Sequence, residues 1–149
     1  EMPKLLERSG NFSRGSITGV YTVLVEGDDT NEPIADTVRG ILDGHIVLSR
    51  QLANSNHYPA IDVSASISRL MTEIVSPEHR QLASRIRDIM SVYEKNADLV
   101  SIGAYKPGTN RKLDFAMSKI DAVNSFLTQD VNEAFSYDQC VAEMAKLLQ

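Results

Sequence analysis

The pattern of apolar residues changes between Thr72 and Pro77, and this change constrains the fold more than any other feature of the sequence. Before it, short runs rich in β-branched residues alternate with short amphipathic segments, as in the strands and helices of an α/β layer. After it, apolar residues recur every three or four positions over long stretches, which is typical of helices around a shared core. The sequence therefore predicts an α/β part over residues 1–72 and an all-α part over residues 73–149.

The most prominent β-rich run in the α/β part is GSITGVYTVLVEGDD, residues 15–29. Residues 16–25 are rich in Ile, Thr, Val and Tyr, and the run is continuous rather than alternating, which predicts a strand covered on both faces. An acidic cluster ends the run, and Pro33 begins a predicted helix, PIADTVRGIL. A second strand, HIVLS at 45–49, and a short helix, RQLANS, follow it. The tripeptide HYP then predicts a turn before AIDVSASISRLM.

Three predicted helices make up the second part. Ser76 suits the N-cap of the first and Pro77 its first position, another covers roughly 111–128, and Ser136 caps the last. The spacing predicts that these residues face a shared core: Leu82, Ile86, Ile89, Tyr93, Leu113, Met117, Ile120, Val123 or Asn124, Leu127, Tyr137, Val141, Met144 and Leu148. The second part is therefore predicted to be a small helical bundle.

Composition narrows the classes of function. The net charge is −5 and both halves are slightly acidic, so neither is a basic arm and we expect no nucleic acid partner. His45, His57 and His79 lie far apart and Cys140 is the single cysteine, so we expect no metal site built from protein ligands alone. Cys140 lies beside the apolar stripe of the last helix, which favours a buried structural thiol over a nucleophile.

Residues 103–109, GAYKPGT, come close to a phosphate-binding loop. The loop motif requires a lysine after its second glycine, and that lysine is absent here. Pro107 also removes one of the backbone N–H groups that such a loop supplies. The favoured interpretation is a helix–helix connection that exposes Tyr105 and Lys106.

Other candidate site residues each allow two interpretations. Glu26, Asp28 and Asp29 could bind Mg²⁺ or orient water at a sheet edge, or they could form a solvated loop that caps the next helix, which is the more common case. Tyr58 is either a packed turn aromatic or a flat face for a base. Arg69 follows a stretch of small residues, SASIS, and could donate a planar fork to phosphate oxygens or pair with a nearby carboxylate.

Several motifs taken together are far more specific than any one of them. In the first part they are VEGDD, NEPIAD, ILDGHIVLSR, NHYPAID and S-x-SR, and in the second IGAYKPGTN and DFAMSKIDAVNSFLTQDVNEAF. This combination resembles the flagellar export ATPase family, the type III secretion relatives of the alpha and beta subunits of rotary ATP synthases. The resemblance implies that residues 1–72 are the C-terminal part of a RecA-like P-loop nucleotide-binding domain whose Walker A and B motifs lie upstream. It implies that 73–149 are the family's helical C-terminal domain.

The resemblance also implies roles for single residues. Arg69 matches the family's arginine finger, which reaches into the site of the neighbouring subunit. Tyr58 matches the aromatic residue that stacks on the adenine of the subunit's own nucleotide. Val131 and Phe135 stand nearest to the residues that complete this pocket. ATP and Mg²⁺ would be held mainly by residues outside this chain, and the acidic cluster would be the edge of their site.

The activity and partners that the resemblance implies belong to the full-length protein. It would hydrolyse ATP at the interfaces of a homohexamer, in the cytoplasm and peripheral to the inner face of the membrane, and so energise export of flagellar proteins. Its partners would be a central stalk protein, an ATPase regulator, the export gate and export chaperone–substrate complexes. We expect this chain alone to be inactive. Two alternatives remain, namely a virulence-type type III secretion ATPase and a non-catalytic adaptor domain derived from one.

Overall fold

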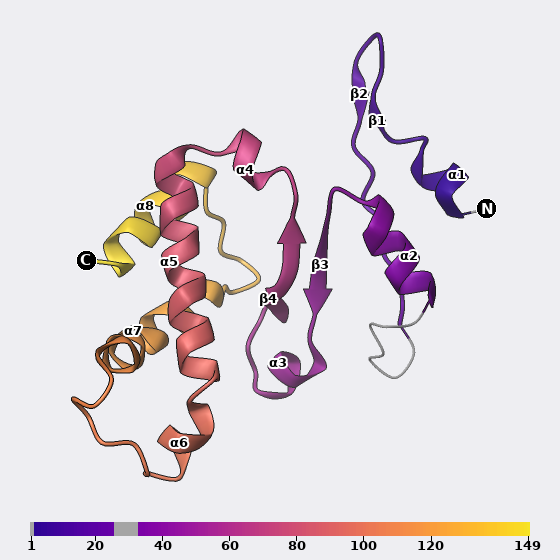
Figure 1. Cartoon of the computed structure of the whole chain (residues 1–149). Helices are drawn as coiled ribbons and strands as arrows, with labels where there is room; N and C mark the ends of the chain where they lie inside the picture. The colour runs from indigo at the N-terminus through magenta and orange to yellow at the C-terminus, as the bar shows by residue number, and fades with distance from the viewer. Residues whose placement is uncertain (1, 26–32) are drawn as a thin grey trace. The chain divides into compact units, whose positions relative to one another are not determined.

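The structure is a computed structural model that describes residues 2–25 and 33–149. The chain divides into two compact units, Glu1–His45 and Ile46–Gln149. Both helices and strands are present, and Figure 1 labels them along the chain. The mixed helix and sheet content agrees with the predicted fold class.

The first unit contains two short helices and a small hairpin. These elements are α1 (Met2–Leu6), β1 (Gly10–Asn11), β2 (Ser16–Ile17) and α2 (Pro33–Ile41). β1 and β2 pair antiparallel, with Gly10 opposite Ile17. Leu6 of α1 and Val38 of α2 are buried where the two helices contact each other. Pro33 begins α2 as predicted, because a proline at the first helical position lacks only an N–H that would have no intrahelical partner.

The strand predicted over residues 16–25 is wrong for most of its length. Only Ser16–Ile17 is a strand, and residues 18–25 have no regular structure. Val20 is 91% exposed and Leu24 is 90% exposed. A strand needs hydrogen-bonded neighbours and a covered face, and no described strand pairs with residues 18–25. The apolar run thus predicts that its side chains are buried, but the described residues do not cover Val20 and Leu24.

The second unit starts with a two-stranded sheet. Its elements are β3 (Gly44–Leu48), of which residues 46–48 belong to this unit, α3 (Arg50–Asn54) and β4 (Ile61–Ser68), and β3 and α3 lie close to the predicted strand and helix. β3 and β4 are hydrogen-bonded neighbours, and their arrows run in opposite directions in Figure 1. Ser49 caps α3 by accepting the N–H of Leu52 on its hydroxyl, while its own N–H donates to the Ala60 carbonyl at 2.8 Å. These bonds hold together the two ends of the turn that contains HYP.

Five helices follow the sheet. They are α4 (Met71–Ile74), α5 (Pro77–Glu94), α6 (Ala97–Ser101), α7 (Arg111–Leu127) and α8 (Tyr137–Leu147). α5, α7 and α8 contact one another around a core of Ile86, Ile89, Ala116, Val123, Met144 and Leu148. Val123 is fully buried and its neighbour Asn124 is exposed, which settles the alternative that the spacing left open. The single-turn helices α4 and α6 were not predicted, because four or five residues are too few to show a periodicity.

Side-chain caps fix the starts of the long helices. The Ser76 hydroxyl accepts the N–H of His79 at 3.1 Å, at the start of α5. The Asn110 side chain accepts the N–H groups of Lys112 and Leu113 at 3.1 and 3.3 Å, at the start of α7. A helix leaves its first N–H groups without intrahelical partners, so these caps explain why the two helices begin where they do.

The start of α8 differs from the prediction in one respect. Ser136 caps the helix as predicted, and with Gln139 it forms a reciprocal capping box. Tyr137, however, was predicted to face the core and is 60% exposed. Its hydroxyl lies 2.7 Å from Nδ1 of His79, and the two rings meet edge to face. The polar hydroxyl thus keeps the ring at the surface, where it joins the starts of α5 and α8.

Candidate functional site

The turn between α3 and β4 carries Tyr58. Its ring is 52% exposed, and the Tyr58–Pro59 peptide bond is cis. Its carbonyl accepts the N–H of Gln129 at 2.9 Å. Gln129 lies in the connection between α7 and α8, so this bond ties the sheet turn to the helical bundle within the second unit.

The connection between α7 and α8 is ordered by its own hydrogen bonds. The Gln129 side chain donates to the Glu133 carbonyl at 2.6 Å, and the Asp130 N–H donates to the Glu133 carboxylate at 2.9 Å. The Asp130 carboxylate in turn accepts the N–H of Asn132 at 3.0 Å. The backbone of this loop is therefore defined without any contribution from a buried side chain.

This loop turns two apolar side chains outward. Val131 is 97% exposed and Phe135 is 54% exposed. Together with the half-exposed ring of Tyr58, they leave apolar surface uncovered on two segments that are joined by one hydrogen bond. The structure thus places three of the predicted site residues on connected segments, and an exposed aromatic ring there offers a flat face to a planar ligand.

Arg69 lies in the short connection between β4 and α4, and it is exposed. The connection continues directly into α4, where the Leu70 carbonyl accepts the N–H groups of Glu73 and Ile74 at 2.9 and 3.1 Å. The arginine is thus held between a strand and a single helical turn rather than in a long loop.

The small residues before Arg69 have a structural use. The Ser66 hydroxyl accepts the N–H of Val47 at 2.9 Å and donates to the Asp62 carbonyl. The Asp62 carboxylate accepts the N–H of Ala65 at 2.9 Å. These bonds link β4 to β3 and fix the course of β4 ahead of Arg69, so at least one serine of SASIS already has its partners.

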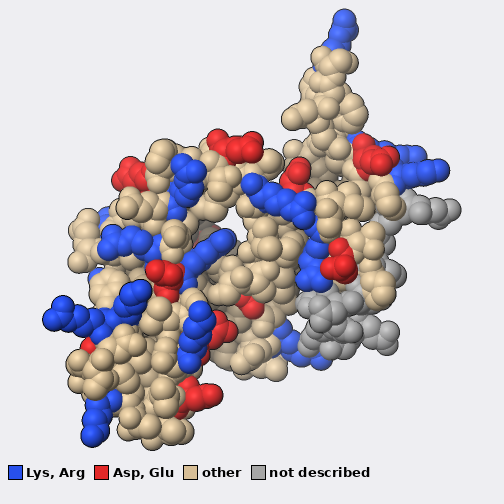
Figure 2. Space-filling view, viewed as in Figure 1, with Lys and Arg blue, Asp and Glu red and all other residues tan. Residues whose placement is uncertain are grey.

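Acidic and basic side chains are interspersed over the helical bundle on the face that Figure 2 shows. No large area of one sign stands out there. This distribution agrees with the small net charge of the chain and does not indicate a nucleic-acid-binding surface on that face.

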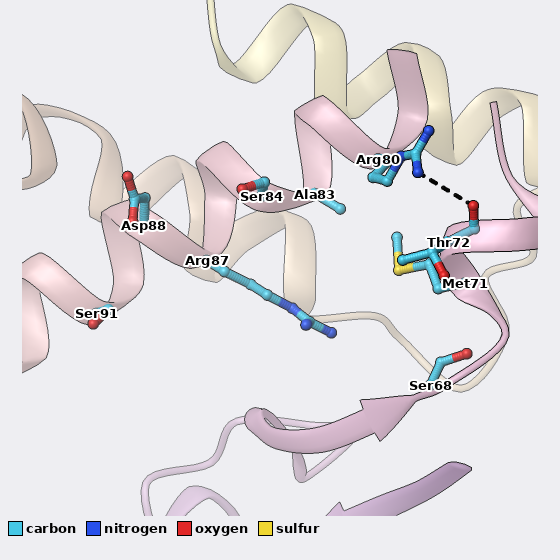
Figure 3. Close-up of a pocket in the computed structure, with 9 residues that line it drawn as sticks. All are labelled: Ser68, Met71, Thr72, Arg80, Ala83, Ser84, Arg87, Asp88 and Ser91. Atoms are coloured by element: carbon cyan, nitrogen blue, oxygen red, sulfur yellow. Dashed lines mark hydrogen bonds between the residues drawn. The ribbon is translucent and has the colours of Figure 1, made fainter. Parts of the chain in front are cut away.

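A groove of about 400 Å³ lies between α5 on one side and the end of β4 and start of α4 on the other (Figure 3). Its lining residues are Ser68, Met71, Thr72, Arg80, Ala83, Ser84, Arg87, Asp88 and Ser91. The Arg80 guanidinium donates to the Thr72 carbonyl at 3.2 Å, while Arg69 is not part of the lining. The groove thus borders the segment that carries Arg69, without containing that side chain.

The GAYKPGT segment connects α6 to α7 and uses its donors internally. The Gly108 N–H donates to the Asp114 carboxylate at 3.0 and 3.2 Å, and the Tyr105 hydroxyl donates to the same carboxylate at 2.9 Å. Tyr105 is therefore half-buried, and the prediction that it is exposed is wrong, whereas Lys106 is exposed as predicted. A carboxylate occupies the donors that a phosphate would need, so this segment is a helix–helix connection.

The described residues do not assemble a metal centre. Among them, no group of three or more His, Cys, Asp or Glu side chains could hold a metal ion. The predicted acidic cluster of Glu26, Asp28 and Asp29 lies outside the described residues. In residues 2–25 and 33–149, no helix is both long enough and apolar enough to cross a membrane.

Two protein families match the chain, each over a different half, and together they cover nearly its whole length. The nucleotide-binding domain of the ATP synthase alpha/beta family matches residues 1–68, and the C-terminal domain of the type III secretion ATPase EscN matches residues 75–146. The chain therefore belongs to the ATP synthase alpha/beta class of nucleotide-binding proteins. Within that class it belongs to the type III secretion ATPases, the family that its motifs resemble.

Individual relatives agree with this assignment. The flagellum-specific ATP synthase of Bacillus subtilis (strain 168) is 48% identical over 98% of this chain and 33% of that protein. The type 3 secretion system ATPase of Xanthomonas euvesicatoria is 48% identical over 93% of this chain and 31% of that protein. The chain thus spans about a third of the length of the curated relatives it matches.

Solved structures show the same fold. The assembled ATPase EscN of the enteropathogenic E. coli type III secretion system matches with a TM-score of 0.95 and 41% identity, over 99% of this chain and 36% of that one. EscN in complex with its central stalk EscO matches with a TM-score of 0.89 and 39% identity, over 99% of this chain and 35% of that one.

The sequence did not identify the contact that joins Tyr58 to the helical bundle. Gln129 belongs to the FLTQ segment, whose resemblance to the family pointed to Val131 and Phe135 instead. The donor is the backbone N–H of Gln129, which almost every amino acid has, so the residue type at this position does not reveal the bond. Arg80 was also missed, because its partner is a carbonyl rather than a side chain.

Proposed function

We propose that this chain is the C-terminal part of an ATPase that hydrolyses ATP between adjacent copies in a ring and energises type III export of flagellar proteins. The observation that carries the proposal is the hydrogen bond from Gln129 to the Tyr58 carbonyl. It joins the two segments that would enclose the adenine, and both of them leave apolar side chains exposed. The similarity to ATPases over nearly the whole chain supports the same conclusion.

In this proposal Tyr58 stacks on the adenine of the subunit's own nucleotide. Val131 and Phe135 line the other side of the pocket. An apolar face with few polar groups suits a planar base, because stacking and burial provide most of the affinity. The exposure of all three side chains supports the assignment, since each has surface available to a ligand.

Arg69 acts in the site of the adjacent subunit as the arginine finger. A guanidinium is always charged and has a planar fork of donors, so it can neutralise the charge that develops on the transferred phosphoryl group. Its exposed position between β4 and α4 supports a role that reaches outward to a neighbour.

The proposed architecture is a RecA-like nucleotide domain over residues 1–72 and a helical C-terminal domain over 73–149. The limits of the two family matches, at residues 68 and 75, support a boundary in this region. The exposure of Val20 and Leu24 supports the view that further strands of a larger sheet would cover residues 18–25. Residues outside this chain would hold the β- and γ-phosphates and most of the Mg²⁺ coordination, with Glu26, Asp28 and Asp29 at the edge of that site.

The proposed assembly is a homohexamer, in the cytoplasm and peripheral to the inner face of the membrane. Its partners would be a central stalk protein, an ATPase regulator, the export gate and chaperone–substrate complexes. Support for the ring and the stalk comes from EscN, which is known as an assembled ATPase and in complex with its central stalk EscO.

A virulence-type secretion ATPase is the second candidate. The Xanthomonas type 3 secretion relative is as similar to this chain as the Bacillus flagellar relative, at 48% identity each. Restoration of motility in a bacterium that lacks its flagellar export ATPase would support the flagellar assignment. Restoration of virulence-type secretion alone would support the second candidate.

The test of the proposal is Arg69→Ala in the full-length protein that contains this chain. We expect kcat for ATP hydrolysis to fall by about a thousandfold or more, while the Kd for ATP changes little. Arg85→Ala is the matched control, because Arg85 is an exposed arginine of α5. Equal losses of binding and turnover in Arg69→Ala would contradict the finger assignment. A full-length protein with no ATPase activity would instead support a non-catalytic adaptor.

A further inference from the structure

The segment that carries Arg69 has little stability of its own. It runs from the end of β4 through α4, which spans only Met71–Ile74. A single helical turn is unstable in isolation, because the conformational cost of its first hydrogen bonds is not recovered over such a short length. The orientation of Arg69 therefore depends on what holds α4 in place.

The carbonyl of Thr72 in α4 needs a partner from elsewhere. The last carbonyls of a helix have no intrahelical N–H to accept from. In the described residues, no backbone N–H outside α4 donates to the Thr72 carbonyl, and the guanidinium of Arg80 donates to it at 3.2 Å. Figure 3 shows this bond as the dashed line that joins Arg80 of α5 to Thr72 of α4.

A second arginine in the same groove provides a comparison. Arg87 lies seven positions after Arg80 on α5, and in Figure 3 its side chain also extends into the groove. Within the described residues, the side chain of Arg87 makes no hydrogen bond or ion pair. The two arginines thus share a helix, a groove and a charge, but only Arg80 holds α4.

We propose that Arg80 is a positioning residue for Arg69. This inference rests on the proposed role of Arg69 as the arginine finger. The guanidinium of Arg80 caps α4 through the Thr72 carbonyl, and so anchors to α5 the segment from which the finger projects. The alignment of Arg69 with a phosphoryl group in the next subunit depends on this anchor, because small displacements of a charged donor weaken its effect on a transition state.

The first test compares Arg80→Ala with Arg87→Ala in the full-length protein. We expect Arg80→Ala to lower kcat by about 10- to 100-fold, with KM for ATP and the stoichiometry of bound nucleotide unchanged. Arg87→Ala should change kcat by less than about twofold. A normal kcat in Arg80→Ala, or an equal fall in Arg87→Ala, would overturn the inference.

A conservative variant separates positioning from a general loss of structure. In Arg80→Lys an ammonium group can still donate to the Thr72 carbonyl, so kcat should recover in part. A merely structural role would instead lower the fraction of protein that binds nucleotide and leave kcat per bound nucleotide intact. That pattern in Arg80→Ala would also overturn the inference.

A double variant separates this inference from the proposed function. If Arg80 acts through Arg69, then Arg80→Ala should cause no further loss of kcat in an Arg69→Ala background. An additional loss there would show that Arg80 acts by another route. Full turnover in Arg69→Ala itself would contradict the proposed function. Loss in Arg69→Ala together with normal turnover in Arg80→Ala would contradict the positioning role alone.

Discussion

Tyr58 shows how one residue can serve two purposes through different groups. Its carbonyl is engaged by Gln129, while its ring stays half-exposed in the proposed adenine pocket. A substitution of the side chain should therefore leave the contact between turn and loop in place. The aromatic type at this position was recognisable from the sequence, but its backbone contact was not.

We predict that Tyr58→Ala in the full-length protein raises KM for ATP by about 10- to 100-fold and leaves kcat nearly unchanged, because the stacking of one base on an aromatic ring is lost. Steady-state ATPase kinetics check this outcome. Tyr58→Phe is the control and should retain the KM of the wild type. A fall in kcat at an unchanged KM would show that Tyr58 acts on the chemistry rather than on adenine binding.

Helices and strands of this chain differ in how well the sequence predicts them. The starts of α5 and α8 and both ends of α7 agree closely with the prediction, because caps such as Ser76 and Ser136 and the apolar periodicity are local signals. The strand over 16–25 was not, because pairing partners decide whether β-branched residues form a strand. Arg69 and Tyr58 were singled out because they match motifs of the family, and their roles stay predictions.

The core shared by α5, α7 and α8 should determine the stability of the bundle. We predict that Ile86→Ala, at a residue of this core that is only 4% exposed, lowers the free energy of unfolding of this chain by about 2–5 kcal/mol. Leu48→Ala is the matched control, because Leu48 is 72% exposed in β3, and it should change that free energy by less than about 0.5 kcal/mol. Urea denaturation followed by circular dichroism measures both. Similar losses in the two variants would mean that the bundle core is not the part that unfolds.

In the proposed function, the chain as a whole would carry the parts of a nucleotide site that do not grip the phosphates. Tyr58, Val131 and Phe135 would contact the base, and Arg69 would serve a neighbour. The segment of this chain that most resembles a phosphate-binding loop is residues 103–109. Its Tyr105 hydroxyl and Gly108 N–H donate to the Asp114 carboxylate. The apolar residues Val20 and Leu24 are likewise exposed, and the strands proposed to cover them would lie outside this chain.

We therefore predict that this chain alone does not hydrolyse ATP above the rate of a blank, even at high protein concentration. It should still show weak binding of adenine nucleotides, because stacking does not need the phosphates. A phosphate-release assay and a titration with a fluorescent ATP analogue measure the two properties, with Tyr58→Ala as the control for specific binding. Measurable hydrolysis that Arg69→Ala abolishes would contradict this division of roles.

The hydrogen bond between the Gln129 N–H and the Tyr58 carbonyl is made entirely by main-chain atoms. Such a joint does not depend on which side chains stand at its two ends, so both positions are free to change during evolution without parting the turn from the loop. Proline at position 129 is the one amino acid that removes the donor itself. Mutation can therefore alter the side chains of the proposed adenine pocket while the main-chain bond between its two segments is kept.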